Sequence, residues 1–286
     1  MIKLFVTDLD GTLLAKHHHA DEKINQMIKT VNENGCTFAF ATGRSANRAT
    51  PDEIDQPLYH ICMNGAIITD TENQLIYQSL MDKDVLKELL ETFPTIDFEC
   101  ITINKSYRRS TKEEWMQQMS KPFKPKHLQP GEEVDEDWHK KFMMDILENN
   151  CFEQTIEEIL AQDICKVNLH LHDKNYDTDA LDKFLEKHKD QLVNLPCDDG
   201  MYEITCAGVD KGSAVAWLAN HLGIQEEQVA TYGDGGNDIP MLERFEHSYA
   251  PVNGLDYVKK KAKHILGPHY EYSVANHIVE TVINKK

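Results

Sequence analysis

The sequence lacks the usual marks of secreted, disulfide-bonded or membrane-spanning proteins. Its seven cysteines are scattered, odd in number and without a C-x-x-C pair, which favours free thiols in a reducing compartment. No uninterrupted apolar stretch approaches the ~18 residues of a transmembrane helix, and the N-terminus does not resemble a signal peptide. We therefore expect a cytoplasmic protein with no membrane partner.

An excess of basic charge is also missing. The 30 Lys and Arg residues are outnumbered by 48 Asp and Glu, which gives a formal net charge of −18 at pH 7. Such an acidic surface argues against nucleic acid as the main partner. A Walker-type glycine loop ending in Lys-Ser/Thr is absent too, which disfavours a small-molecule kinase. Any anionic ligand must therefore be bound by a local group of cations and backbone amides.

The 286 residues are enough for two domains. Apolar runs predict strands at 2–7, 37–41 and 58–63. Between the first two, Ile24 and the apolar residues at i+3, i+4 and i+7 predict a helix with one buried stripe. The same alternation returns in residues 211–282, with a helix at 211–223 and a buried strand at 229–232. This order predicts an α/β fold, a Rossmann-like doubly wound parallel sheet with helices on both faces.

The middle of the chain has a different texture. A helical stripe that begins at Leu86 ends at Pro94, residues 96–104 suggest a strand, and the proline- and acid-rich stretch 121–137 suggests a loop. A further strand alternates an apolar face with a polar one made of Lys166, Asn168, His170 and His172. We expect residues 83–198 to form an α/β cap domain inserted into a core made of residues 1–82 and 199–286.

Four short segments of the predicted core carry chemical groups. They are Asp8-Leu9-Asp10-Gly11-Thr12, Thr42-Gly43-Arg44, Lys211-Gly212 and Gly233-Asp234-Gly235-Gly236-Asn237-Asp238. Asp8, Thr42 and Asp234 each follow directly after a predicted parallel strand. Ligands of open α/β sheets bind outside the carboxyl ends of the strands, so these segments are expected to meet at one sheet edge.

The residue types in these segments suit phosphoryl transfer. Asp8 is the candidate nucleophile, and Asp10 can protonate a leaving alkoxide and then deprotonate a water. Asp234 and Asp238 place further carboxylates there, which a divalent cation such as Mg²⁺ would make tolerable, and the Asp10 carbonyl can also bind it. The candidates for phosphate binding are Thr42, Gly43, Lys211 and Asn237.

Each segment is weak evidence by itself. A D-x-D after a strand is more often turn or cap chemistry, a lysine before a glycine is usually solvated, and a glycine-rich acidic stretch can be a plain loop. Their combination, in this order and at strand ends, favours one catalytic site over four unrelated turns. The histidines 17–19, Arg108 and Arg109 are more simply read as solvated side chains.

With all four segments present, the chain resembles the haloacid dehalogenase superfamily, specifically its Cof-type phosphatases with a type-IIB cap. The resemblance implies Asp8 as nucleophile, Asp10 as acid/base, and phosphate held by Thr42, Lys211 and Asn237. It also implies Mg²⁺ bound by Asp8, the Asp10 carbonyl and Asp234. Asp238 would lie either beside the ion or behind the residues that bind it directly. Related ion-pumping ATPases have threonine where this chain has Asp10, so the resemblance favours hydrolysis.

These observations lead us to expect a Mg²⁺-dependent phosphatase that acts on small phosphorylated metabolites, foremost sugar phosphates, through an aspartyl-phosphate. We expect a monomer or weak homodimer. A phosphomutase of the same superfamily and a non-catalytic sensor of phosphorylated ligands stay as alternatives. Nothing in residues 95–190 identifies the substrate.

Overall fold

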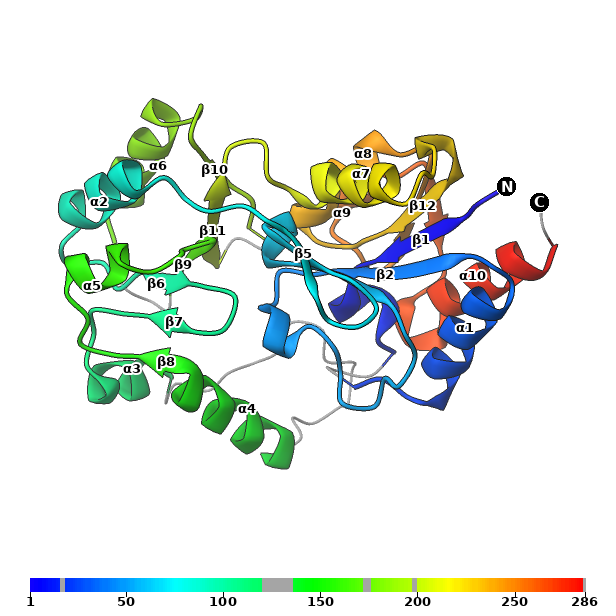
Figure 1. Cartoon of the computed structure of the whole chain (residues 1–286), viewed down its shortest axis with the longest axis horizontal. Coiled ribbons are helices and arrows are strands. Elements are labelled where there is room, and N and C mark those ends of the chain that lie inside the picture. The colour runs from blue at the N-terminus through cyan, green and yellow to red at the C-terminus, as the bar shows by residue number, and fades with distance from the viewer. Residues whose placement is uncertain (16–18, 120–135, 172–175, 197–199, 285–286) are drawn as a thin grey trace. The chain divides into compact units, whose positions relative to one another are not determined.

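The computed structural model describes all residues except 16–18, 120–135, 172–175, 197–199 and 285–286. The chain forms two compact units (Figure 1). Residues Met1–Gln78 and Gly208–Lys286 make up the first, which we call the core unit, and Ser79–Ala207 make up the second, the cap unit.

The core unit contains an eight-stranded sheet in the order β14-β13-β12-β1-β2-β3-β4-β5. All neighbours from β14 to β3 are parallel, whereas β4 and β5 are antiparallel to their neighbours. The strands are β1 (Leu4–Thr7), β2 (Thr37–Ala41), β3 (Tyr59–Cys62), β4 (Ile67–Thr69), β5 (Leu75–Gln78), β12 (Val229–Tyr232), β13 (His247–Pro251) and β14 (His264–Leu266).

Strand β1 is the point at which the strand order switches. The chain runs from β1 to β2 and β3 on one side, and it later fills the other side with β12, β13 and β14. In open α/β sheets, such a switch leaves a crevice outside the carboxyl ends of the strands, where ligands bind. The residues that follow β1, β2 and β12 therefore belong to the expected binding edge.

Helices cover both faces of this sheet. Helices α1 (Glu22–Glu33) and α10 (Ser273–Asn284) pack on the face that includes Phe5. Helices α7 (Lys211–His221) and α8 (Ile239–Arg244) pack on the opposite face, which includes Leu4 and Val6; the short helix α9 is Asp256–Lys259. Successive side chains of β1 thus enter different cores, as the period of a strand requires. The predicted doubly wound α/β core is confirmed.

The cap unit contains a six-stranded sheet in the order β10-β11-β9-β6-β7-β8, antiparallel except between β7 and β8. Its strands are β6 (Glu99–Ile101), β7 (Ser106–Tyr107), β8 (Asn150–Cys151), β9 (Lys166–His170), β10 (Leu192–Asn194) and β11 (Met201–Cys206). Its helices are α2 (Lys83–Thr92), α3 (Lys112–Met119), α4 (Glu136–Asn149), α5 (Ile156–Leu160) and α6 (Thr178–Lys187). Apolar residues of α2, α5 and α6 share one core with Val167 and Leu169 of β9.

Three local expectations need correction. Strand β11 pairs with β9 and β10, so the chain returns to the core unit at Gly208, later than residue 199. The strand expected at 96–104 is limited to β6, because only Glu99–Ile101 pair with β9. The expected loop at 121–137 ends in helix, since α4 begins at Glu136; its residues 121–135 lie outside the described part of the chain.

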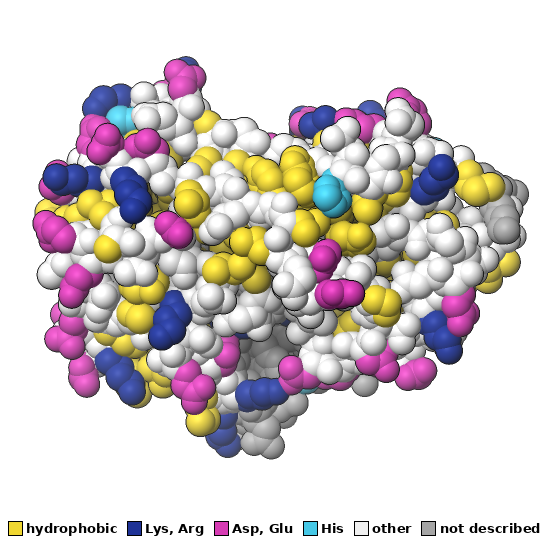
Figure 2. All heavy atoms as spheres, viewed as in Figure 1, with side chains coloured by type: hydrophobic (Ala, Val, Ile, Leu, Met, Phe, Trp, Pro, Cys, Tyr) yellow, Lys and Arg dark blue, Asp and Glu magenta, His cyan; other side chains and the backbone are white. Residues whose placement is uncertain are grey.

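Surface charge is mixed on the face shown in Figure 2, where acidic side chains are spread over each unit and interspersed with Lys and Arg. On that face Lys and Arg side chains do not gather into one large patch. Among the described residues, every helix is too short or too polar to cross a bilayer. Cys62 and Cys165 are buried free thiols, as predicted.

Candidate active site

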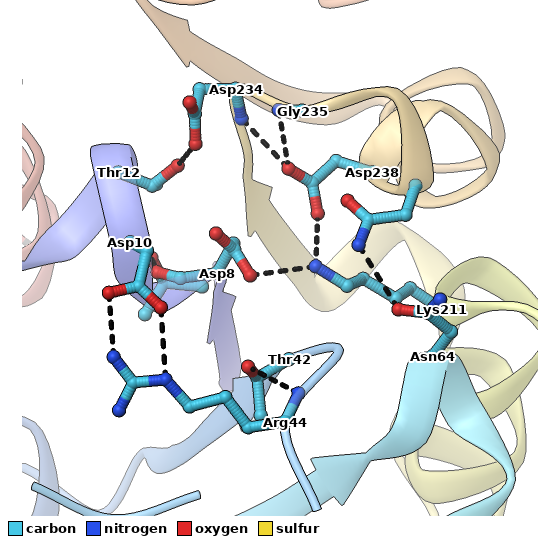
Figure 3. Close-up of polar contacts among 12 residues, drawn as sticks. Asp8, Asp10, Thr12, Thr42, Arg44, Asn64, Lys211, Asp234, Gly235 and Asp238 are labelled. Carbon is cyan, nitrogen blue, oxygen red and sulfur yellow. Dashed lines mark hydrogen bonds and ion pairs between the residues drawn. The ribbon is translucent and has the colours of Figure 1, made fainter. Parts of the chain in front are cut away.

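Three adjacent strands bring the candidate residues to one edge of the core sheet. The Asp8 amide donates to the Tyr232 carbonyl of β12 at 2.9 Å, and the Thr42 amide donates to the Ile61 carbonyl at 2.8 Å. These bonds continue the backbone ladder one residue beyond β1 and β2, which fixes where the first loop residues lie. Figure 3 shows the side chains of all four sequence segments in this one region.

Lys211 is the cation at the centre of the site. It is the first residue of α7, whose N-terminus is capped by the Asp210 side chain accepting from the Ser213 amide at 2.7 Å. Its Nζ donates to Asp8 Oδ1 at 2.7 Å and to Asp238 Oδ1 at 2.6 Å, and the side chain is fully buried. The ammonium therefore links the candidate nucleophile to the loop that follows β12.

Asp238 organises that loop through its second oxygen. Asp238 Oδ2 accepts the backbone amides of Asp234 and Gly235, each at 2.9 Å. A Cβ at Gly233 would lie 2.4 Å from the Asp238 Cβ, so the loop can close around this carboxylate only with glycine at that position. Asp238 therefore binds Lys211 with one oxygen and the loop amides with the other, which fixes the position of the lysine relative to the loop.

Asp234 is the third carboxylate, and Thr12 holds it by donating its hydroxyl to Asp234 Oδ1 at 2.5 Å. Carboxylate oxygens of Asp8, Asp234 and Asp238 all lie within 4.8 Å of one another. Three acidic groups face one ammonium, so this cluster carries excess negative charge when ionised. Oxygen ligands at such spacing are typical of a hard divalent cation, and the donor set fits one.

The pKa values reflect this crowding. Burial raises the pKa of Asp8 to about 7, although the Lys211 ammonium opposes the shift. Burial, followed by the charges of Asp8 and Asp238, raises the pKa of Asp234 well above its usual range. Burial alone would lower the pKa of Lys211, but the charges of Asp238 and Asp8 raise it, so the lysine stays protonated.

The candidate phosphate ligands line the same edge. Thr42 Oγ1 accepts the Arg44 amide at 3.2 Å, so the Thr42 hydroxyl can direct its proton to another acceptor. Asn237 Nδ2 donates to Asn64 Oδ1 at 3.1 Å, which ties the loop after β12 to the turn after β3. Gly43 lies between Thr42 and Arg44 and is partly buried. The phosphate-binding role of all three, and of Lys211, stays a prediction.

The sequence did not single out three contributors. Thr12 and Arg44 lie inside the first two motifs but had no predicted role, and Asn64 lies outside the four motifs. Asn64 adopts a left-handed φ of 55°, and a Cβ at Gly65 would lie 2.4 Å from the Asp210 carbonyl oxygen. An Asn-Gly pair directly after a strand was a signal for this close approach to α7.

Several cap residues differ from the expectation of solvated side chains. Arg108 is buried and pairs with Asp97 at 3.3 Å and Glu99 at 3.2 Å. The Arg109 guanidinium donates to three backbone carbonyls, those of Leu90, Phe93 and Ile96. Both arginines therefore stabilise the cap unit itself.

Other polar candidates also have protein partners. Lys166 is fully buried and paired with Glu203, whereas His170 is partly exposed and lies 3.7 Å from Glu99. In the histidine run, His19 contacts Glu53 at 2.8 Å. Residues 17, 18 and 172 lie outside the described residues.

Comparisons with known proteins agree with this geometry. The family model of haloacid dehalogenase-like hydrolases matches residues 5–278. The 5-amino-6-(5-phospho-D-ribitylamino)uracil phosphatase YwtE of Bacillus subtilis (strain 168) is 28% identical, with 96% of each chain covered. A second relative of the same description, YcsE of B. subtilis, is 25% identical and covers 99% of this chain and 96% of its own.

Solved structures share the fold of the whole chain. A haloacid dehalogenase-like hydrolase from B. subtilis superposes with a TM-score of 0.78 at 20% identity, covering 97% of this chain and 99% of its own. The subclass IIB sugar phosphatase BT4131 gives a TM-score of 0.71 at 19% identity, covering 96% and 97%. The resemblance inferred from the four motifs is confirmed: this chain belongs to the haloacid dehalogenase-like hydrolases.

Proposed function

We propose that this chain is a Mg²⁺-dependent phosphatase that hydrolyses small phosphorylated metabolites through an aspartyl-phosphate on Asp8. The observation that carries the proposal is the contact of a buried ammonium, Lys211, with Asp8 at the carboxyl end of β1, inside a cluster of carboxylates. An anionic nucleophile and an anionic substrate can meet there only if cations compensate their charges. Uncatalysed monoester hydrolysis is so slow that enzymes reach enhancements of up to ~10²¹-fold, and electrostatic stabilisation carries most of it.

Asp8 is oriented for attack. One carboxylate oxygen accepts from Lys211, and Figure 3 shows the other pointing away from that ammonium. In the first step the free oxygen bonds to phosphorus, the ester P–O bond breaks, and the proton of Asp10 passes to the leaving oxygen. In the second step water attacks the phosphorus, Asp10 accepts its proton, and the bond between phosphorus and Asp8 breaks.

The remaining residues hold the phosphoryl oxygens and the cation. Thr42, the Gly43 backbone, Lys211 and Asn237 would donate to the transferring group. Asp8, Asp234 and the Asp10 carbonyl would hold Mg²⁺, with Asp238 adjacent to them. The ion would supply positive charge to the phosphoryl oxygens where negative charge builds up.

We further propose an alkyl phosphate of a sugar or polyol as substrate. The family relatives YwtE and YcsE are named for a substrate with a phosphorylated ribityl chain, and BT4131 is a sugar phosphatase. Both descriptions name a phosphate carried by a sugar or a sugar-derived chain, and the alkoxide of such a chain is a poor leaving group that needs a proton from a residue such as Asp10. The monomeric or weakly dimeric state and the cytoplasmic location stay predictions from the sequence.

A phosphate-release assay tests the function. The purified chain, with Mg²⁺ and a panel of hexose, pentose and pentitol phosphates, is expected to release one phosphate per substrate consumed, and excess EDTA is expected to stop it. Conversion of substrate to an isomeric phosphate without free phosphate would identify a phosphomutase instead. Tight binding of a phosphorylated compound with no turnover would identify a sensor. Either result would overturn the proposal.

The acidic cluster also predicts how Mg²⁺ stabilisation depends on pH. Because the pKa of Asp8 rises from 3.8 to about 7 on folding, the folded metal-free chain binds more protons than the unfolded chain between these values. Its stability therefore falls as pH rises from about 4 to about 7. Mg²⁺ binds the deprotonated carboxylates, so the rise in Tm on adding Mg²⁺ is expected to be larger at pH 8 than at pH 5.5.

Differential scanning calorimetry with and without EDTA measures this difference. The Asp8→Asn variant is the control, since it removes the titrating group while keeping the shape of the side chain. Its Mg²⁺-dependent shift should vary less with pH than that of the parent chain. An equal Tm shift at both pH values in the parent chain would contradict the assignment of the cluster as the metal site.

A further inference from the structure

Arg44 has a contact that the proposed reaction does not yet use. Its guanidinium binds the Asp10 carboxylate with two nearly parallel bonds, Nε to Oδ2 at 2.9 Å and NH2 to Oδ1 at 2.6 Å (Figure 3). Arginine presents its donors in a planar fork that matches a carboxylate in two places at once. The pair therefore sets the plane of the Asp10 carboxylate as well as its position.

The backbone of Arg44 is fixed from two sides. Its amide donates to Thr42 Oγ1 at 3.2 Å, and its carbonyl accepts the Met63 amide at 2.9 Å. The adjacent Asn64 amide donates to the Thr42 carbonyl at 3.1 Å. The Arg44 side chain is also held by the Arg48 carbonyl, which accepts from NH1 at 3.5 Å. The fork thus projects from a loop that is tied to the ends of both β2 and β3.

We infer that Arg44 is a positioning residue that aims Asp10 at the oxygen of the leaving group, with Thr42 and Asp10 held by the same loop. The inference rests on the proposed function, in which Asp10 transfers a proton to that oxygen. The Asp10 and Arg44 side chains are 23% and 20% exposed, so the pair is partly open to solvent. A carboxylate has about four lone-pair sites, so the fork does not exhaust its capacity to carry a proton.

Loss of the fork should affect proton transfer more than binding. Loss of both bonds of the fork changes the plane and position of the Asp10 carboxylate, and a catalytic group displaced by about 1 Å can cost ~10²-fold in rate. The penalty depends on the leaving group. Phenoxide needs a proton as it departs, whereas 4-nitrophenoxide is stable as an anion and needs one much less. This difference separates an effect on proton donation from general damage to the site.

The test compares phenyl phosphate with 4-nitrophenyl phosphate in the Arg44→Gln variant with saturating Mg²⁺. The two probes are similar in shape, and kcat/KM reports the steps up to formation of the aspartyl-phosphate. We expect kcat/KM to fall about 10²- to 10³-fold for phenyl phosphate, within the usual range for general acid catalysis. The fall for 4-nitrophenyl phosphate should be at least about 10-fold smaller.

Four further variants sharpen the result. Arg48→Gln is the matched control, because it removes the same charge from the same loop while the Arg48 side chain contacts Ser45; it should leave the ratio between the two substrates unchanged. Arg44→Lys keeps the charge without the fork and should restore only part of the phenyl phosphate activity. Asp10→Asn should show the same preference for 4-nitrophenyl phosphate, and adding Arg44→Gln to it should not increase that preference.

Equal losses on both substrates in Arg44→Gln, or a further increase of the preference in the double variant, would overturn the inference. If Arg44→Gln does not fold, the same comparison is made with Arg44→Lys, which keeps the positive charge. Failure of the proposed function looks different, because the parent chain would then release no phosphate from either probe.

Discussion

The Asp8→Asn variant is expected to release phosphate on the order of 10⁵-fold more slowly than the parent chain, the scale seen when an enzyme loses its nucleophile. The amide is a poor nucleophile and cannot form the acyl phosphate. It keeps the oxygen that accepts from Lys211 Nζ, which is 2.7 Å away in the parent chain. The measurement is the initial rate of phosphate release from the best substrate of the panel, with Mg²⁺ at saturation.

The folded state of this variant should survive the change. Asp8→Asn leaves two carboxylates instead of three around one ammonium, so the metal-free variant should be at least as stable as the parent at pH 8. Asp70→Asn is the matched control, because Asp70 caps the turn between β4 and β5 through Glu72 and Gln74; it should retain full activity. An Asp8→Asn protein with normal Tm and undiminished phosphate release would remove Asp8 from the mechanism.

The meeting of Asp8, Thr42 and Asp234 at one sheet edge was predictable, because it depends only on the positions of strands that local apolar patterns reveal. The strands β2 and β12 have the bounds that the apolar runs predicted, and the helical stripe of Ile24, Met27, Ile28 and Val31 is buried in α1. Three of the four motifs begin directly after a strand end, at Asp8, Thr42 and Gly233. The remaining motif begins with α7 at Lys211. Parallel strands place their carboxyl ends together, so a correct assignment of β1, β2 and β12 was enough to bring Asp8, Thr42 and Asp234 together.

The contacts that orient these groups were not predictable, because they join distant parts of the chain. Thr12 and Asp234 are 222 residues apart, and Asn64 and Asn237 are 173 apart. Whether the two side chains of each pair meet depends on how far their loops extend beyond the sheet edge, and no local sequence pattern encodes that distance. The fork of Arg44 on Asp10 is of the same kind, since it joins a residue of the second motif to one of the first.

The cap unit shows a second limit of sequence reasoning. The alternation in β9 correctly gave a strand with a polar face, but alternation does not reveal whether polar side chains meet water or one another. Lys166 is fully buried and paired with Glu203 of the neighbouring strand β11. Arg108 is likewise neutralised by Asp97 and Glu99. The charge of Arg108 was expected to be solvated because its partners are not adjacent to it in the sequence.

Replacing Lys211 by methionine is expected to lower both activity and stability. Methionine has a similar length and fits the buried stem, but it leaves Asp8 and Asp238 without the ammonium they share. Removing one partner of a buried ion pair costs about 3–5 kcal/mol, and loss of one group that stabilises the transition state costs about 10²- to 10³-fold in kcat. Urea denaturation in EDTA and phosphate release with Mg²⁺ measure the two effects. Lys189→Met, which breaks an exposed pair with Glu186, is the control and should change neither measurably.

The origin of that instability can be isolated with a double-mutant cycle. If the cost of Lys211→Met arises from uncompensated carboxylates, it should shrink by about 0.5–3 kcal/mol when Asp8→Asn is already present, because one of the orphaned charges is gone. Mg²⁺ should also reduce the cost in the single variant, since the cation replaces part of the lost positive charge. Equal costs in both backgrounds, with no effect of Mg²⁺, would show that Lys211 contributes packing alone. In that case the charge balance that supports Asp8 as an anionic nucleophile would have to come from elsewhere in the site.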